Sequence, residues 1–152
     1  MTIIPDNTDE KDYSIPWLSS HGSLMVSDKS IHIRIGLDFI RYYKWLIDRR
    51  IRTITNEPAH GAHITLWNQN HHGVIPRDKT DQLMRFYNKT RIKFDYYPYI
   101  FVGGYTKGFY NFYMNVVSPE IDSINRTLHG RVKNSLHITI SNTKGGSRPY
   151  IF

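Results

Sequence analysis

The chain has 152 residues, a length typical of one domain that is large enough to bury a substantial core. It contains no cysteine, which excludes disulfides, a thiol nucleophile and a thiolate metal site, and we recognise neither a signal peptide nor an apolar run of the roughly 18–20 residues that a membrane helix needs. Twenty Lys and Arg against 13 Asp and Glu give a net charge of +7, and 14% of residues are aromatic; this favours a nucleotide or nucleic-acid partner, although an ordinary basic surface fits equally well.

The N-terminal part of the chain lacks a clear period. Residues 1–29 contain Pro5, Pro16 and Gly22 among many polar positions. Because these residues interrupt helices and strands, we expect an irregular N-terminal arm with room for one short strand. Tyr13 is its candidate binding residue, since it could close over a bound base or simply anchor the arm to the body.

Two regular elements follow the arm. Residues 30–35 alternate between isoleucine and polar residues, which is the period of a half-buried strand, and His32 and Arg34 share its polar face. Arg34 is a candidate phosphate contact, although a solvated arginine is the simpler interpretation. Residues 37–51 repeat apolar side chains at three- and four-residue steps, which predicts an amphipathic helix.

The second half of the chain predicts a similar mixture. Residues 62–67 form a strand pattern, and Asp78 could cap a short helix that reaches about residue 88. The aromatic-rich stretch 93–117 is broken by Pro and Gly, which indicates two or three antiparallel strands. Ser118-Pro119 then predicts the start of a helix whose apolar stripe extends to Val132, before a last strand at residues 136–140.

The elements form a repeat. A strand, a helix and a strand containing His-Ile-Thr occur over residues 31–66 and again over about 109–140. We therefore expect a single α+β domain over residues 1–152, with two similar lobes whose antiparallel sheets surround a central cleft and whose helices lie outside.

The repeated tripeptide contains chemically useful side chains. The alternation predicts that His63, Thr65 and Trp67 share one strand face and that His137, Thr139 and Ser141 likewise share one, while the branched neighbours face the core. Composition predicts roughly 0.2 matches to His-apolar-Ser/Thr-apolar by chance, so a symmetric pair is informative where one match would not be. Two imidazoles can act as general base and general acid at neutral pH, and each threonine can donate a hydrogen bond to a phosphate oxygen. This chemistry requires no metal or other cofactor.

The two motifs, His63-Ile-Thr65-Leu and His137-Ile-Thr139-Ile, are 74 residues apart (137 − 63) and resemble the paired His-x-Thr/Ser motifs of the 2H phosphoesterase superfamily. Within it, the chain most resembles the bacteriophage anti-CBASS phosphodiesterases, which degrade cyclic di- and trinucleotides that bacteria make as an antiphage alarm. The resemblance implies catalytic roles for both His-Thr pairs, without deciding which histidine is the base. It also implies hydrolysis of 3′-5′ bonds in the cytoplasm of an infected bacterial cell.

Further candidate substrate contacts lie near the motifs. Trp67 continues the predicted face of His63 and could stack on a base, although packing is the commoner role of such a residue. Tyr105 lies in the aromatic stretch, where core packing is again the alternative. Lys144 follows the second motif beside glycines and could help to cradle a phosphate, or could belong to an exposed basic loop.

The sequence also raises three other interpretations, the first of which we reject. His60, His63, His71 and His72 could suggest zinc, but His60 and His63 would fall on opposite strand faces, so we expect no metal. The chain could instead act on RNA ends or 2′-5′ oligoadenylates, as other members of the superfamily do. It could also be a non-catalytic nucleotide or nucleic-acid binding module. We expect a cyclic oligonucleotide as its partner, with no membrane and no stable complex with long nucleic acid.

Overall fold

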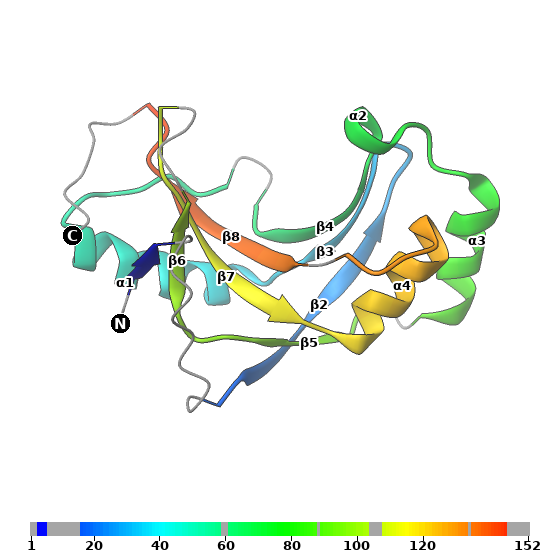
Figure 1. Cartoon of the computed structure of the whole chain (residues 1–152), viewed down its shortest axis with the longest axis horizontal. Helices are drawn as coiled ribbons and strands as arrows, with labels where there is room; N and C mark the ends of the chain where they lie inside the picture. The colour runs from blue at the N-terminus through cyan, green and yellow to red at the C-terminus, as the bar shows by residue number, and fades with distance from the viewer. Residues whose placement is uncertain are drawn as a thin grey trace.

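The computed structural model describes residues 3–5, 16–58, 61–87, 89–103, 108–133 and 135–145 (Figure 1). It is an α+β protein in which a largely antiparallel sheet is accompanied by a few helices. The elements follow in the order β1 (Ile3–Pro5), β2 (Leu18–Val26), β3 (Ser30–Arg34), α1 (Leu37–Ile51), β4 (His63–Asn68), α2 (Gln69–His72), α3 (Arg77–Phe86), β5 (Ile92–Tyr96), β6 (Ile100–Gly103), β7 (Asn111–Val117), α4 (Pro119–His129) and β8 (Leu136–Asn142).

The sheet is nearly closed. Within the described residues its strand order is β1-β6-β7-β5-β2-β3-β4, and β8 pairs with β7. The β1–β6 pair is parallel, whereas the other ladders are antiparallel. Strands β4 and β8 lie side by side across the gap that remains (Figure 1). This arrangement brings the two strands that contain His-Ile-Thr next to each other.

The predicted repeat is present in the structure. In the first copy β3 leads through α1 into β4, and in the second β7 leads through α4 into β8. Each closing strand pairs antiparallel with the strand that opens its own copy. The two helices bury the predicted apolar residues, namely Ile40, Ile47, Ile51, Ile121, Ile124 and Leu128. Val132 lies beyond the end of α4, because Gly130 adopts the left-handed conformation that terminates the helix.

The starts of α3 and α4 show which of the two capping predictions holds. Ser118 is the N-cap of α4 as predicted: its Oγ accepts a hydrogen bond from the Ile121 amide at 3.0 Å and donates one to the Lys93 carbonyl at 2.6 Å. The prediction for α3 is wrong in detail. Its N-cap is Pro76, and Asp78 lies in the first turn, where a carboxylate still complements the helix dipole.

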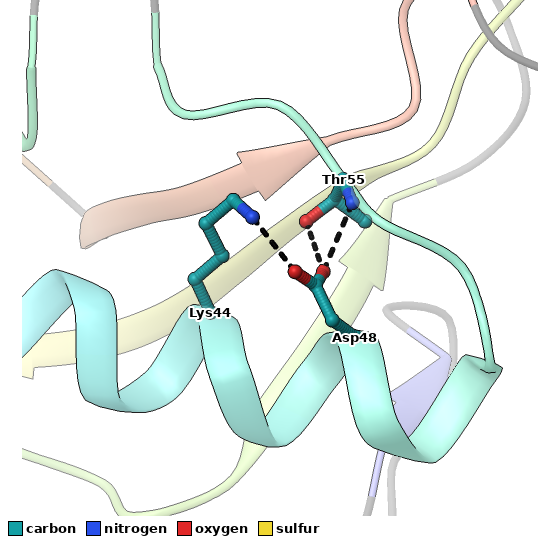
Figure 2. A network of polar contacts seen from close by, with 3 residues as sticks. All are labelled: Lys44, Asp48 and Thr55. Carbon is teal, nitrogen blue, oxygen red and sulfur yellow. Dashed lines mark hydrogen bonds and ion pairs between the residues drawn. The ribbon is translucent and has the colours of Figure 1, made fainter.

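The loop that follows α1 is fixed by a carboxylate. Asp48 accepts hydrogen bonds from the Lys44 ammonium at 2.7 Å, the Thr55 amide at 3.0 Å and the Thr55 hydroxyl at 2.6 Å (Figure 2). The next residue, Asn56, forms a backbone bridge with Asn142 at the end of β8. The connection between α1 and β4 is therefore attached to the second copy of the repeat at Asn142.

The expectation of an irregular arm with room for only one short strand is wrong over residues 18–26. Residues 18–26 form β2, a nine-residue strand that pairs with both β3 and β5. Gly22, which the sequence pattern marks as a break, lies inside this strand. A Cβ there would lie 2.5 Å from Ile33 Cγ2 and 2.7 Å from the Arg34 carbonyl oxygen, so glycine permits the close approach of β3.

This packing predicts that Gly22→Ala destabilises the protein. We expect a loss of roughly 1–3 kcal/mol in the free energy of unfolding, because the added methyl group overpacks the interface between β2 and β3. Gly36→Ala is the control, since a Cβ at Gly36 meets nothing within 4 Å and only the N-cap preference of glycine over alanine at the start of α1 is lost. Urea unfolding measures both variants, and equal stability of the two would contradict the packing argument.

Candidate active site

The two His-Thr pairs line one cavity of about 200 Å³. His63 and Thr65 come from β4, and His137 and Thr139 come from β8. The other residues lining this catalytic cavity, as we call it below, are Pro58, Gly61, Ile64, Lys133 and Leu136. The structure thus brings together two His-Thr pairs that lie 74 residues apart in the sequence (137 − 63).

The strand register explains how β4 contributes to this face. His63 lies opposite Arg34 and Thr65 lies opposite His32 in the β3–β4 ladder. Directly opposed residues in an antiparallel pair share a face, so these four polar side chains lie on one side of the sheet. Ile64 is buried on the other side, in the core.

Strand β8 repeats the arrangement against β7. His137 lies opposite Asn115, and Thr139 lies opposite Tyr113. Ile138 between them is fully buried. In both copies, therefore, a histidine and a threonine occupy alternate positions on the cavity side while the intervening isoleucine anchors the strand in the core.

Both ladders also shift register one residue after the threonine. Leu66 is the extra residue in β4 and Ile140 is the extra residue in β8, so that Trp67 pairs with Ile31 and Ser141 pairs with Phe112. A bulge of this kind moves the following side chain to the opposite face. The expected continuation of the His63 face through Trp67, and of the His137 face through Ser141, is therefore wrong.

Trp67 consequently lies in a packed environment. Only 7% of its surface is exposed, and its ring stacks on His129 with a centroid separation of 4.8 Å and an interplanar angle of 10°. Its Nε1 donates to the Gly73 carbonyl at 2.8 Å. These contacts assign Trp67 a structural role, which was the alternative to base stacking.

His63 is oriented by its neighbours. Its Nδ1 lies 2.9 Å from the Gly61 carbonyl oxygen, which can only accept, so Nδ1 carries a proton. The ring also makes an edge contact with His32 at a centroid separation of 5.4 Å. Nε2 is therefore the nitrogen of His63 that remains for proton exchange with a ligand.

His137 has a different electrostatic environment. Its ring contacts Tyr113 edge-on, with centroids 5.6 Å apart. Although the side chain keeps access to solvent, partial burial of the imidazole lowers its pKa below the usual 6.5, and the positive charge of Lys133 and the nearby His63 add to this effect. At neutral pH the neutral form of His137 is accordingly favoured.

Lys133 is a site residue that the sequence did not reveal. It lines the catalytic cavity and is close enough to His137 to lower its pKa. It lies in the connection between α4 and β8, outside any periodic element or motif. No sequence signal marks it among the 20 lysines and arginines of the chain.

The remaining predicted residues have mixed outcomes. Arg34 is exposed and lies opposite His63, next to the cavity but not among its lining residues. Lys144 is exposed; its amide donates to Asn142 Oδ1 at 3.0 Å, and it too does not line the cavity. Tyr13, Tyr105 and His60 lie outside the described residues.

Three further observations bear on the nature of the site. Across the described ranges, no three His, Asp or Glu side chains are grouped in a way that could hold a metal ion. In the same part of the chain, no helix is long and apolar enough to cross a membrane. Comparisons of the chain with protein-family models, curated proteins and solved structures found no match.

Proposed function

We propose that this protein is a metal-independent phosphodiesterase that uses His63 and His137 as its general acid–base pair. The observation that supports it is the convergence of both His-Thr pairs on one cavity of about 200 Å³. Two imidazoles can remove one proton and deliver another, and two hydroxyls beside them can hold the phosphate.

The environments of the two histidines suggest their roles in the first step. His137, whose pKa is lowered, is the base that takes the proton from the attacking 2′-hydroxyl. The 2′-oxygen then bonds to phosphorus and the bond to the 5′-oxygen breaks. His63, whose Nδ1 proton is held by the Gly61 carbonyl, donates its Nε2 proton to the departing 5′-oxygen. The product carries a 2′,3′-cyclic phosphate.

Hydrolysis of this product reverses the two roles. Neutral His63 takes a proton from water, the water oxygen attacks phosphorus, and the protonated His137 returns its proton to the sugar oxygen that leaves. The result is a linear nucleotide with a terminal phosphate. Thr65, Thr139 and Lys133 stabilise the charge on the non-bridging oxygens in both steps, because all three line the same cavity.

We infer that the substrates are cyclic di- and trinucleotides with 3′-5′ bonds, such as 3′,3′-cGAMP. The support is the resemblance of the paired motifs to the anti-CBASS branch of the 2H phosphoesterases, together with the net charge of +7, which attracts phosphates. The repeated strand–helix–strand unit is consistent with the two-lobed fold of that superfamily. In this proposal the protein counters antiphage signalling in the cytoplasm of an infected bacterium.

A substrate without the 2′-hydroxyl tests the mechanism. We expect 3′,3′-cGAMP to be linearised. The analogue that lacks the 2′-hydroxyl on both nucleosides should remain intact while still competing for binding. Chromatography with mass detection follows both compounds. Equal cleavage of the two would show that the nucleophile comes from elsewhere and would contradict the proposed first step.

Lys133→Met should change the pH dependence of kcat/KM. The base is active when neutral, so kcat/KM falls as pH drops through the pKa of His137, with a midpoint below 6.5 in the wild type. Loss of the lysine charge raises that pKa, and we expect the midpoint to move to higher pH. Lys89→Met, which removes an exposed lysine lining neither cavity described here, is the control. An unmoved midpoint in Lys133→Met would contradict the assignment of His137 as base.

A further inference from the structure

A second cavity of about 400 Å³ adjoins the catalytic cavity. The two share Thr65 and Lys133, so these residues lie at the border between the cavities. The remaining residues that line this neighbouring cavity, as we call it below, are Leu66, His72, Asn125, His129, Arg131, Val132 and Ser135.

Asn125 is an unusual residue on the buried side of α4. Its neighbours on that side, Ile121, Ile124 and Leu128, are apolar, yet Asn125 is only 1% exposed. Its Nδ2 atom is buried and makes no hydrogen bond within the described residues. A buried amide donor without a partner is costly, so an acceptor supplied by a ligand would satisfy it.

Several other groups of this cavity can donate hydrogen bonds to a ligand or carry positive charge. His72 Nδ1 accepts the Asn68 amide proton at 3.0 Å, so a neutral His72 carries its own proton on Nε2. Arg131 and Lys133 add two positive charges. A lining of N–H donors and cations suits a phosphate, which offers only acceptor oxygens, better than a base.

One wall of the neighbouring cavity is fixed by a hydrogen bond and by ring stacking, both made by His129. His129 Nε2 donates to the Leu66 carbonyl at 2.7 Å, and its ring is fixed by stacking on Trp67. Leu66 is the extra residue of the β4 bulge, so the bulge itself supplies the carbonyl that binds His129. The irregularity that removes Trp67 from the catalytic face therefore also shapes the neighbouring cavity.

We propose that the neighbouring cavity binds a second phosphate of the substrate, adjacent to the phosphate that is cleaved. This inference rests on the proposed function and deepens it. Successive phosphates in a nucleotide chain are separated by a single sugar, and the shared residues Thr65 and Lys133 place the two cavities side by side. The cavity thereby selects for substrates with at least two phosphates over mononucleotides.

The test compares two substrates that differ in phosphate number. We would measure kcat/KM for 3′,3′-cGAMP and for 2′,3′-cyclic AMP with the wild type, Asn125→Leu and Arg131→Met. Loss of a hydrogen bond to a charged group should lower kcat/KM for the dinucleotide roughly 10-fold to 100-fold, mainly through KM, and leave the mononucleotide nearly unchanged. Arg126→Met removes an exposed arginine of α4 that does not line either cavity and should behave like the wild type.

A binding experiment separates failure of this inference from failure of the proposed function. In the His63→Ala/His137→Ala protein, the Asn125 side-chain amide signals should shift in NMR on titration with pApA and much less with AMP. If the wild type cleaves neither substrate but these shifts occur, the phosphodiesterase proposal fails and the phosphate site stands. Equal shifts with both nucleotides, no shift, or equal losses on both substrates would overturn the second-phosphate site.

Discussion

Alanine at His63 or at His137 is expected to lower kcat on 3′,3′-cGAMP by about 10²–10⁴, because each step needs both a base and an acid. The double variant should lose little more activity than the less active of the two single variants, since either replacement disables the same acid–base pair. Both side chains retain contact with solvent, so the fold should survive their removal. Steady-state kinetics measures the loss of activity of each variant, and circular dichroism checks that its fold is retained.

The matched control for these variants is His21→Ala. His21 is an exposed histidine of β2 that lines neither of the two cavities. Its replacement should leave kcat within about twofold of the wild type. Retention of more than a tenth of the activity by His63→Ala or His137→Ala would show that the histidine concerned does not take part in proton transfer.

Replacement of Thr65 or Thr139 with valine is expected to lower kcat by about 10²–10³. Valine keeps the shape of threonine but removes the hydroxyl that donates to the phosphate, and a donor aimed at developing charge contributes effects of this size. Thr65 and Thr139 lie in the same cavity as the histidines, so the loss should fall on kcat more than on KM.

Serine variants provide the control for this prediction. Thr65→Ser and Thr139→Ser keep the hydroxyl and lose only a methyl group, so most of the activity should return. Stability measured by thermal unfolding should be similar for the serine and valine proteins. If serine is as damaging as valine at either position, the methyl group and its packing matter more than the proposed hydrogen bond.

Much of the fold could be predicted from the period of its apolar residues. The isoleucines of residues 30–35 and the apolar stripe of residues 37–51 give β3 and α1, and Ser118 gives the start of α4. Strand β2 could not be predicted because its sequence, Leu-Ser-Ser-His-Gly-Ser-Leu-Met-Val, has neither alternation nor β-branched enrichment over most of its length. Its conformation depends on pairing with β3 and β5, and the sequence of one strand alone does not show such pairing.

The candidate site was partly predictable for a similar reason. Alternation along one strand correctly placed His63 with Thr65, and His137 with Thr139. Trp67 and Ser141 were misplaced because a bulge is a relation between two strands and leaves no mark on one of them. Lys133 was missed because its connection has no period, so only the folded chain shows which cation reaches the cavity.

The most direct test of the central claim is incubation of the wild-type protein and the His63→Ala/His137→Ala variant with 3′,3′-cGAMP in excess EDTA. A parallel panel contains 2′,3′-cyclic AMP and 2′-5′ oligoadenylate, and products are resolved by chromatography and mass. We predict linear product from 3′,3′-cGAMP with the wild type alone. Cleavage confined to the other substrates would contradict the cyclic-dinucleotide assignment, and intact substrates throughout would contradict the phosphodiesterase itself.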